Sequence, residues 1–313
     1  MAASLQQLRR ATTQLAIRHA IKATATLPGS VQRSIVGSAI CLASGIPMLR
    51  SRVRQNMLLA LGQDVSVEAE RMYFRHLRWV LTNSLSTFHH GIAATPVLTD
   101  VRFDESIRVL DEAAAEGRGV VLIGAHWSGH ELVAAIINRR HPMALLVRSA
   151  TESERAARKL KWYDALGVEI VVRQSGASNF KDAAAYLRVL KRGKLLAITP
   201  DLLADAEQGI ETRIFGRNAR LHGGAFALAH AAKAPMIRLS VRWQSDSRLV
   251  AMFDRAPQFF DMSDRDAAIR AGIQDWCRWF EDKLRASPEN WLFWLDKRWS
   301  RFLRTATLAP GAE

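Results

Sequence analysis

The chain has 313 residues, of which 49% are hydrophobic, and carries a formal net charge of +14 at pH 7. This length allows one large domain with appended helices or two small domains with a sizeable core, and the two cysteines, Cys41 and Cys277, argue against a disulfide framework and fit a reducing compartment. The charge indicates an anionic partner, which can be a membrane surface, an acidic carrier protein, a phosphorylated substrate or nucleic acid.

Residues 1–62 are basic and apolar and form a predicted membrane-associated helical segment. No Asp or Glu precedes Asp64, whereas basic residues recur at Arg9, Arg10, Arg18, Lys22, Arg33, Arg50, Arg52 and Arg54. The apolar stretch 35–49 has about 15 residues, fewer than the ~20 that cross a bilayer unaided, so we expect it to lie at the interface or to span only marginally. Basic flanks favour the anionic cytoplasmic leaflet. A mitochondrial transit peptide or a merely solvated basic face are the alternatives.

The remainder of the chain predicts an α/β domain over residues 63–305 and a short tail at 306–313. A helix is expected at 65–92, with Arg71, Arg75 and Arg78 on one face that could contact phosphate or simply face solvent. Strands are expected near 120–124, 143–148, 168–173, 194–199 and 235–242, and helices near 130–139, 152–165, 178–192 and 222–232. This alternation predicts a mostly parallel central sheet flanked by helices.

A later apolar stripe predicts an amphipathic helix that packs on the core, with Cys277 on its buried face. The stripe consists of Ile269, Ile273, Trp276, Phe280 and Leu284. No internal repeat or long linker interrupts the chain.

His126 and Glu131 stand where the strand expected at 120–124 turns into the next helix. The apolar run before them is typical of a strand buried on both faces, and in open α/β sheets ligands bind beyond the carboxyl ends of the strands. A histidine held by a carboxylate can take a proton from a hydroxyl as that oxygen attacks a carbonyl. We therefore interpret His126 as a general base, with Glu131 orienting its ring and stabilising the imidazolium.

Two other interpretations fit the same residues. Ser128 and Glu131 match a capping box, in which Ser128 is the N-cap and Glu131 bonds back to its N–H. His126 and His130 have a spacing that suits zinc, but Glu131 is misplaced for the H-E-x-x-H arrangement and no third ligand suggests itself. We expect neither a metal nor another cofactor.

Further motifs follow this one in a fixed order. They are Leu146-Val147-Arg148, Thr199-Pro200-Asp201 at a strand end, Phe215-Gly216-Arg217-Asn218-Ala219, a small-residue helix from Gly224, and Ala234-Pro235-Met236-Ile237. In these motifs the chain resembles the late acyltransferases of lipid A biosynthesis, the lauroyl and myristoyl transferase family within the lysophospholipid acyltransferase superfamily. The hallmark of that family is His, four residues, then Asp or Glu. The resemblance covers roughly residues 30–303.

This resemblance implies a glycerolipid-acyltransferase-like fold and a membrane-associated enzyme. The enzyme would move a fatty acyl chain from acyl carrier protein or acyl-CoA to a hydroxyl of a lipid A precursor or a related lipid, at the cytoplasmic face of the inner membrane. The resemblance further implies that Arg148, Arg173 and Arg217 bind acceptor phosphate or stabilise developing negative charge, and that Asp201 organises the pocket. Arginine suits phosphate because its planar fork donates two hydrogen bonds at once.

Alternatives remain for the whole chain and for its C-terminal part. Residues 128–130 differ from the family's usual Gly-Asn-Trp, which leaves open a lipid-binding relative without turnover. A basic nucleic-acid-binding protein is supported by the charge alone, and we expect no nucleic-acid partner. The segment 291–299 places tryptophans beside cations, a composition that fits a membrane-docking face and a core element equally.

Overall fold

The computed structural model describes residues 19, 21–62, 65–149, 153–173, 179–205, 209–244 and 248–307. Residues 1–18 of the expected membrane-associated segment, with Arg9, Arg10 and Arg18, lie outside the described residues, and so do residues 308–313 of the expected tail.

A seven-stranded sheet with the strand order β1-β9-β8-β2-β5-β3-β4 forms the centre of the protein. Five neighbours, β8, β2, β5, β3 and β4, pair in parallel, β9 is antiparallel to β8, and β1 is parallel to β9. The prediction of a mostly parallel sheet is therefore confirmed. The strands are β1 (Val101–Phe103), β2 (Val120–Ile123), β3 (Met143–Arg148), β4 (Glu169–Arg173), β5 (Leu195–Ile198), β8 (Met236–Trp243) and β9 (Leu249–Arg255).

The helices between these strands cover both faces of the sheet. The chain moves outward from β2 to β3 to β4 through α7 (His130–Asn138) and α8 (Ser153–Leu166), and returns to β5 and β8 through α9 (Asn179–Lys191) and α10 (Gly224–Ala232). Because such crossovers are right-handed, reversing the direction moves the helices to the opposite face. Consistent with this, α7 contacts α8 and α9 contacts α10. The direction changes between β2 and β5.

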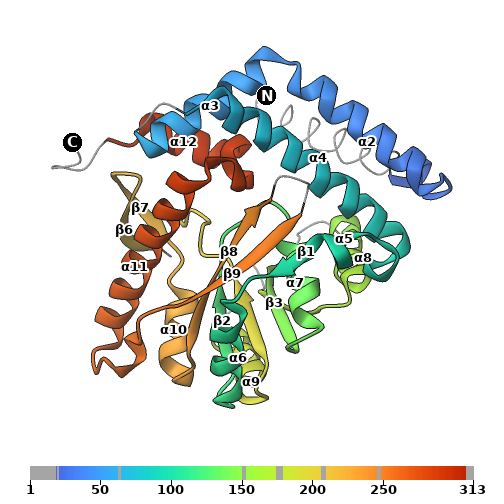
Figure 1. The fold of residues 1–313 in the computed structure, drawn as a ribbon. Coiled ribbons are helices and arrows are strands. Elements are labelled where there is room, and N and C mark those ends of the chain that lie inside the picture. The colour runs from blue at the N-terminus through green and yellow to red at the C-terminus, as the bar shows by residue number, and fades with distance from the viewer. Residues whose placement is uncertain are drawn as a thin grey trace.

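Three N-terminal helices, α2 (Gly29–Ser44), α3 (Pro47–Leu61) and α4 (Val67–His90), cross one edge of the sheet (Figure 1). The predicted single apolar stretch 35–49 is divided, because Pro47 begins α3 and keeps Ile46 extended. Ser66 caps α4 by accepting a hydrogen bond from the backbone N–H of Ala69. Val53 and Met57 of α3 are fully buried in the core, so α3 packs together with residues beyond position 62. The domain boundary expected at residue 62 stays a prediction.

Within the described residues no single helix combines the length and apolar character needed to cross a membrane. By length and composition, α2 and α3 satisfy that requirement only when taken together, as a pair bent by 74°.

The C-terminal helices pack against α3 and α10. The predicted late helix is present as α11 (Arg265–Ala286), and Cys277 on it is buried as expected. Trp291, Trp294 and Trp299 are at most 1% exposed. Of the two interpretations of segment 291–299, a core element or a membrane-docking face, its tryptophans therefore fit the core element. The other elements are η1 (Ile92–Ala94), α5 (Val97–Asp100), α6 (Ile107–Ala115), the hairpin β6 (Ile210–Ile214) and β7 (Arg217–Leu221), η2 (Phe259–Asp261), η3 (Pro288–Asn290), η4 (Leu292–Leu295) and α12 (Lys297–Thr305).

Candidate active site

The loops that follow β2 and β5 begin side by side and then separate. The two strands pair in parallel, with Ile123 opposite Ile198, yet their connections lead to opposite faces of the sheet. Such a switch in direction opens a crevice at the carboxyl ends of the strands, where ligands bind in open α/β sheets. His126 lies in the loop after β2 and Asp201 in the loop after β5. The fold thus brings a histidine and a carboxylate to the crevice from distant parts of the chain.

Asp201 binds His126 through two hydrogen bonds. Oδ1 of Asp201 is 2.7 Å from Nδ1 of the imidazole, and Oδ2 accepts the backbone N–H of His126 at 2.8 Å. The indole N–H of Trp291 donates to the same Oδ2 at 2.8 Å, and that of Trp299 donates to the backbone carbonyl of Asp201 at 2.9 Å. Asp201 is completely buried, whereas the His126 side chain is 22% exposed. The carboxylate is therefore fixed, and the ring that it holds remains accessible.

The pair has a defined protonation state. Burial raises the pKa of Asp201, but the charge of His126 and the hydrogen bonds from His126 and Trp291 outweigh it, so the pKa lies below its ordinary value. Burial lowers the pKa of His126, but the charge of Asp201 and its hydrogen bond raise it above the usual histidine value. An ionised carboxylate only accepts hydrogen bonds, so Nδ1 carries the proton. In the neutral ring Nε2 is then left as an acceptor.

Two rings fix the plane of this imidazole. Phe293 stacks on His126 with 4.2 Å between ring centroids and an interplanar angle of 28°, and His130 meets it edge-on at 5.0 Å. Nδ1 of His130 lies 3.0 Å from the backbone carbonyl of Trp127. Burial and the neighbouring His126 lower the pKa of His130. His130 is therefore a neutral wall of the crevice, and His126 is the basic group.

Glu131 binds partners on α8. Its carboxylate accepts hydrogen bonds from the indole N–H of Trp162 at 2.9 Å and from the hydroxyl of Tyr163 at 2.6 Å. Among the described contacts no hydrogen bond joins Glu131 to His126, although its negative charge acts to raise the pKa of that histidine. The orienting hydrogen bond that the sequence led us to expect from Glu131 comes from Asp201.

The capping box is also absent from this helix start. The helix α7 begins at His130 after Gly129, with no side-chain cap, and the buried hydroxyl of Ser128 has no hydrogen-bond partner. Gly129 has φ +86°, a backbone conformation that residues with a Cβ rarely adopt, and a Cβ there would also lie 2.9 Å from Cδ1 of Leu249. The sharp turn that ends at α7 thus depends on glycine.

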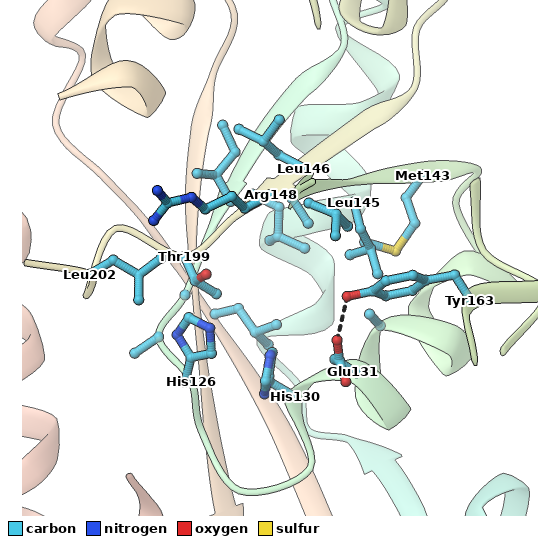
Figure 2. A pocket seen from close by; sticks show the side chains of 18 of the residues that line it. His126, His130, Glu131, Met143, Leu145, Leu146, Arg148, Tyr163, Thr199 and Leu202 are labelled. Carbon is cyan, nitrogen blue, oxygen red and sulfur yellow. Dashed lines mark hydrogen bonds between the residues drawn. The ribbon is translucent and has the colours of Figure 1, made fainter. Parts of the chain in front are cut away.

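A pocket of about 210 Å³ opens beside His126. In Figure 2, His126, His130 and Glu131 follow one another along one wall, with the Tyr163 hydroxyl bonded to Glu131 at the far end. The side chains at that end are largely apolar and include Met143 and Leu145. The other lining residues are Leu122, Gly124, Ala125, Ala134, Leu146, Val147, Arg148, Lys159, Ala197, Ile198, Thr199, Leu202 and Leu239. The pocket therefore has a polar end with a base and an apolar end suited to hydrocarbon.

Cationic side chains gather at the polar end. Arg148 lines the pocket and extends on the same side of Figure 2 as His126 and Leu202. Arg148 and Arg173 are paired in register at the ends of β3 and β4. Burial lowers the pKa of His222, and the positive charges of Arg173 and Arg148 lower it further. An anionic group at this end would meet a concentrated positive charge.

The sequence was also compared with known families. The family model described as bacterial lipid A biosynthesis acyltransferase matches residues 2–301. The chain belongs to this family. It is therefore an acyltransferase of lipid A synthesis, which uses an acyl donor and a lipid acceptor, and the family is generally membrane-associated. A comparison with curated proteins found no match.

One of the residues that the family resemblance suggested lies away from the pocket of this acyltransferase. Arg217 is 7% exposed, and its Nη1 donates to the backbone carbonyls of Leu59 and Phe215, both at 2.8 Å. These bonds join the β6–β7 turn to α3. The structure brings Arg148 and Asp201 to the site and pairs Arg173 with Arg148 at the end of the neighbouring strand, outside the residues that line the pocket. It gives Arg217 a place in the scaffold.

Other functional residues of this acyltransferase were not recognised in the sequence. Trp291, Trp299 and Phe293 hold the Asp201–His126 pair, and Tyr163 and Lys159 line the pocket. The aromatic segment 291–299 was the one available signal, and its composition did not tell core from membrane surface. In the described part of the chain no group of three His, Cys, Asp or Glu side chains is placed to hold a metal ion.

Proposed function

We propose that this acyltransferase moves a fatty acyl chain from a thioester to a hydroxyl of a lipid A precursor or a closely related lipid, with His126 as general base. The observation that carries the proposal is the His126–Asp201 pair, in which a buried carboxylate holds Nδ1 and leaves Nε2 at the mouth of a pocket. Asp201 would fix the tautomer and stabilise the imidazolium, the role that the third member of a catalytic triad performs.

The reaction consists of two proton transfers around one tetrahedral intermediate. Nε2 of His126 removes the proton of the acceptor hydroxyl while that oxygen attacks the thioester carbonyl carbon. The C–O bond forms, and the carbonyl oxygen becomes negatively charged. As the C–S bond breaks, the imidazolium returns its proton to the departing sulfur, so that an ester and a free thiol are produced. The base is regenerated without a covalent acyl-enzyme.

The two ends of the pocket suit the two parts of this chemistry. The apolar end, with Met143, Leu145 and Tyr163, would hold the acyl chain, since each buried methylene contributes ~0.8 kcal/mol. Arg148 and Arg173 would bind a phosphate of the acceptor, as bidentate guanidinium–phosphate contacts are among the strongest hydrogen bonds in proteins. The donor is an acyl thioester of acyl carrier protein or of coenzyme A.

Placement at the cytoplasmic face of the inner membrane is part of the same proposal. The helices α2 and α3 lie across one edge of the sheet (Figure 1), and several of their apolar side chains are exposed, including Ile35, Leu42 and Met48. Docking these side chains in a bilayer would present the pocket to lipid acceptors, while the carrier-bound donor arrives from the aqueous side.

The decisive test is lipid mass spectrometry of cells that lack the gene and are complemented by variants. The wild-type gene should restore one acyl-sized mass to a single lipid, and His126→Ala should not. A matched control exists on the surface, where Nε2 of His141 lies 2.7 Å from Asp111 Oδ1, outside the residues that line the pocket. His141→Ala removes a similar His–Asp pair and should complement fully. Complementation by His126→Ala would refute the base.

The same experiment addresses a lipid-binding relative without turnover. In that case the lipid profile of the deletion strain would be unchanged in every complemented strain. Purified protein with acyl carrier protein and coenzyme A thioesters in parallel then identifies the donor, because only the correct carrier releases free thiol at a rate that depends on His126.

A further inference from the structure

A second pocket of about 310 Å³ lies between α2, α3 and α4, and none of its lining residues borders the pocket of His126. Its floor and walls come from Ile40, Cys41 and Ser44 of α2, Arg50 of α3, and Glu70, Arg71, Phe74, Arg75 and Arg78 of α4. Four guanidinium groups therefore face one cavity. The sequence had indicated only that three of them share a face of one helix.

The described residues do not balance the positive charge in this second pocket. Glu70 is completely buried and accepts one hydrogen bond from Arg50 and two from Arg54. These three hydrogen bonds occupy the one carboxylate that lines the pocket. Arg71 makes a long, exposed contact of 3.7 Å with Glu68.

The two remaining arginines have no carboxylate partner among the described residues. Arg75 donates to the sulfur of Met72 at 3.0 Å, and Arg78 lies against Gly37, whose missing side chain makes room for its guanidinium. Arginines held this way can each give two parallel hydrogen bonds to a phosphate. The cavity is thus arranged for an anion that the described residues do not provide.

The surroundings of the second pocket select the kind of anion. Val31, Ile35 and Leu42 are spaced to lie on one face of α2 and are 40%, 45% and 76% exposed. That stripe faces away from the pocket residues of α2, but Ile46 and Met48, which are 44% and 64% exposed, stand in the bend between the pocket residues Ser44 and Arg50, so exposed apolar side chains adjoin the arginines there. A ligand that fits both features has a phosphate attached to hydrocarbon.

We infer that this second pocket binds the headgroup phosphate of an anionic phospholipid, with the acyl chains of that lipid beside the exposed apolar side chains of the bend between α2 and α3. The bound lipid would hold α2 and α4 against the bilayer at a defined depth. This inference concerns other residues than the proposed base, so it stands or falls independently of the chemistry at His126.

The first test measures binding to vesicles of phosphatidylcholine alone and of phosphatidylcholine mixed with phosphatidylglycerol. Arg75→Gln with Arg78→Gln should weaken binding to the anionic vesicles about thirtyfold, the effect of two cations near a charged surface. Lys191→Gln with Arg192→Gln removes the same charge at exposed positions on and after the end of α9, and should change binding little. Equal losses in both double variants would reduce the effect to net charge and overturn the site.

A second test leaves the charge unchanged. Cys41 is exposed and Cys277 is buried, and they are the only cysteines, so N-ethylmaleimide should modify Cys41 selectively and place a neutral group in the second pocket. The modified wild-type protein should bind anionic vesicles severalfold more weakly, with its circular dichroism unaltered. Unimpaired binding after modification would exclude the pocket.

Further arms separate lipid from free phosphate and binding from catalysis. Inorganic phosphate at constant ionic strength should protect Cys41 from modification less than phosphatidylglycerol vesicles do. Protection by phosphate alone, with none by vesicles, would assign the site to a soluble anion and contradict the lipid. His126→Ala should bind vesicles as wild type does, so that failure of the proposed base leaves this result readable.

Discussion

Asp201 holds His126 at both its ring and its backbone, with Oδ1 2.7 Å from Nδ1 and Oδ2 2.8 Å from the backbone nitrogen. This double contact fixes the ring and the loop that carries it as a single unit. The same Oδ2 also accepts the Trp291 indole N–H, so no freedom remains for the carboxylate to rotate away. The arrangement makes Asp201 the residue on which the orientation of the proposed base depends.

Replacing Asp201 by Asn should therefore reduce kcat by roughly 10³–10⁴-fold, the size of effect seen when a triad carboxylate becomes an amide and the wrong tautomer is favoured. Steady-state rates with thioester donor check this. The change is nearly isosteric, so circular dichroism should be unaltered. A loss below tenfold would show that another group orients His126.

The pH profile should report the same pair. His126 must be neutral to accept a proton, and its pKa is raised above 6.5 by the charge and hydrogen bond of Asp201, which outweigh burial. We therefore expect kcat/KM to fall on acidification already above pH 6.5. Without the carboxylate charge, the residual activity of Asp201→Asn should lose its acid limb at lower pH than wild type. An unchanged midpoint would assign the titration to another group.

Glu131 should behave differently from Asp201. Glu131→Gln keeps an acceptor for Trp162 but turns the other oxygen into an amide N–H that the Tyr163 hydroxyl must accept, so charge-assisted bonds become neutral ones at a cost of about 1–3 kcal/mol in the free energy of unfolding. A double-mutant cycle with Tyr163→Phe, followed by denaturant titration, measures how much of this cost belongs to the Tyr163 bond. Transfer should fall far less in Glu131→Gln than in Asp201→Asn. Equal losses would restore the direct orienting role first expected for Glu131.

Arg148 and Arg217 should separate into substrate contact and scaffold. Arg148 is exposed at the pocket, so Arg148→Gln should raise KM for a phosphorylated acceptor at least tenfold with little change in Tm. Arg217→Gln breaks the buried bonds to Leu59 and Phe215 and should lower Tm while leaving KM near wild type. Paired kinetic and thermal measurements decide, and a raised KM in Arg217→Gln would return that residue to the site.

Asn56 should stabilise the contact between α3 and the C-terminal elements. Its Nδ2 donates to the Trp294 carbonyl at 2.7 Å and to the Ser300 hydroxyl at 2.8 Å, in a fully packed setting. Asn56→Ala should cost about 2 kcal/mol in the free energy of unfolding. The exposed neighbour Gln55→Ala is the control and should have a Tm near wild type. Similar Tm values for both variants would show that these bonds contribute little.

The sequence predicted the fold best where apolar strands alternate regularly with helical stretches. The strands β2, β3, β4, β5 and β8 and the helices α7 to α10 were expected near their observed bounds, since each strand is a continuous apolar run followed by a helical stretch. The edge strand β1 has only three residues, Val101–Phe103, too few for a pattern to develop. The strands of the hairpin β6–β7 and strand β9 lie outside the regular alternation and were not expected.

The site was predictable in its residues but not in its pairing. His126 and Asp201 were both recognised at strand ends, yet nothing local shows that β2 and β5 are neighbours in the sheet. The pattern of His126 and Glu131 suggested a hydrogen-bonded pair of residues five positions apart. The observed pair, His126 and Asp201, joins residues 75 positions apart. Strand order is a tertiary property, so the partner of the histidine could not be read from spacing.

The indole donors of Trp291 and Trp299 give the active site a dependence on the order of synthesis. All the strands of the sheet leave the ribosome before these two residues do, so a nascent chain can pair β2 with β5 while Asp201 still lacks its two indole partners. Alignment of His126 then follows the pairing of these strands. An acyltransferase assembled in this way stays idle until residues 291–299 have been made.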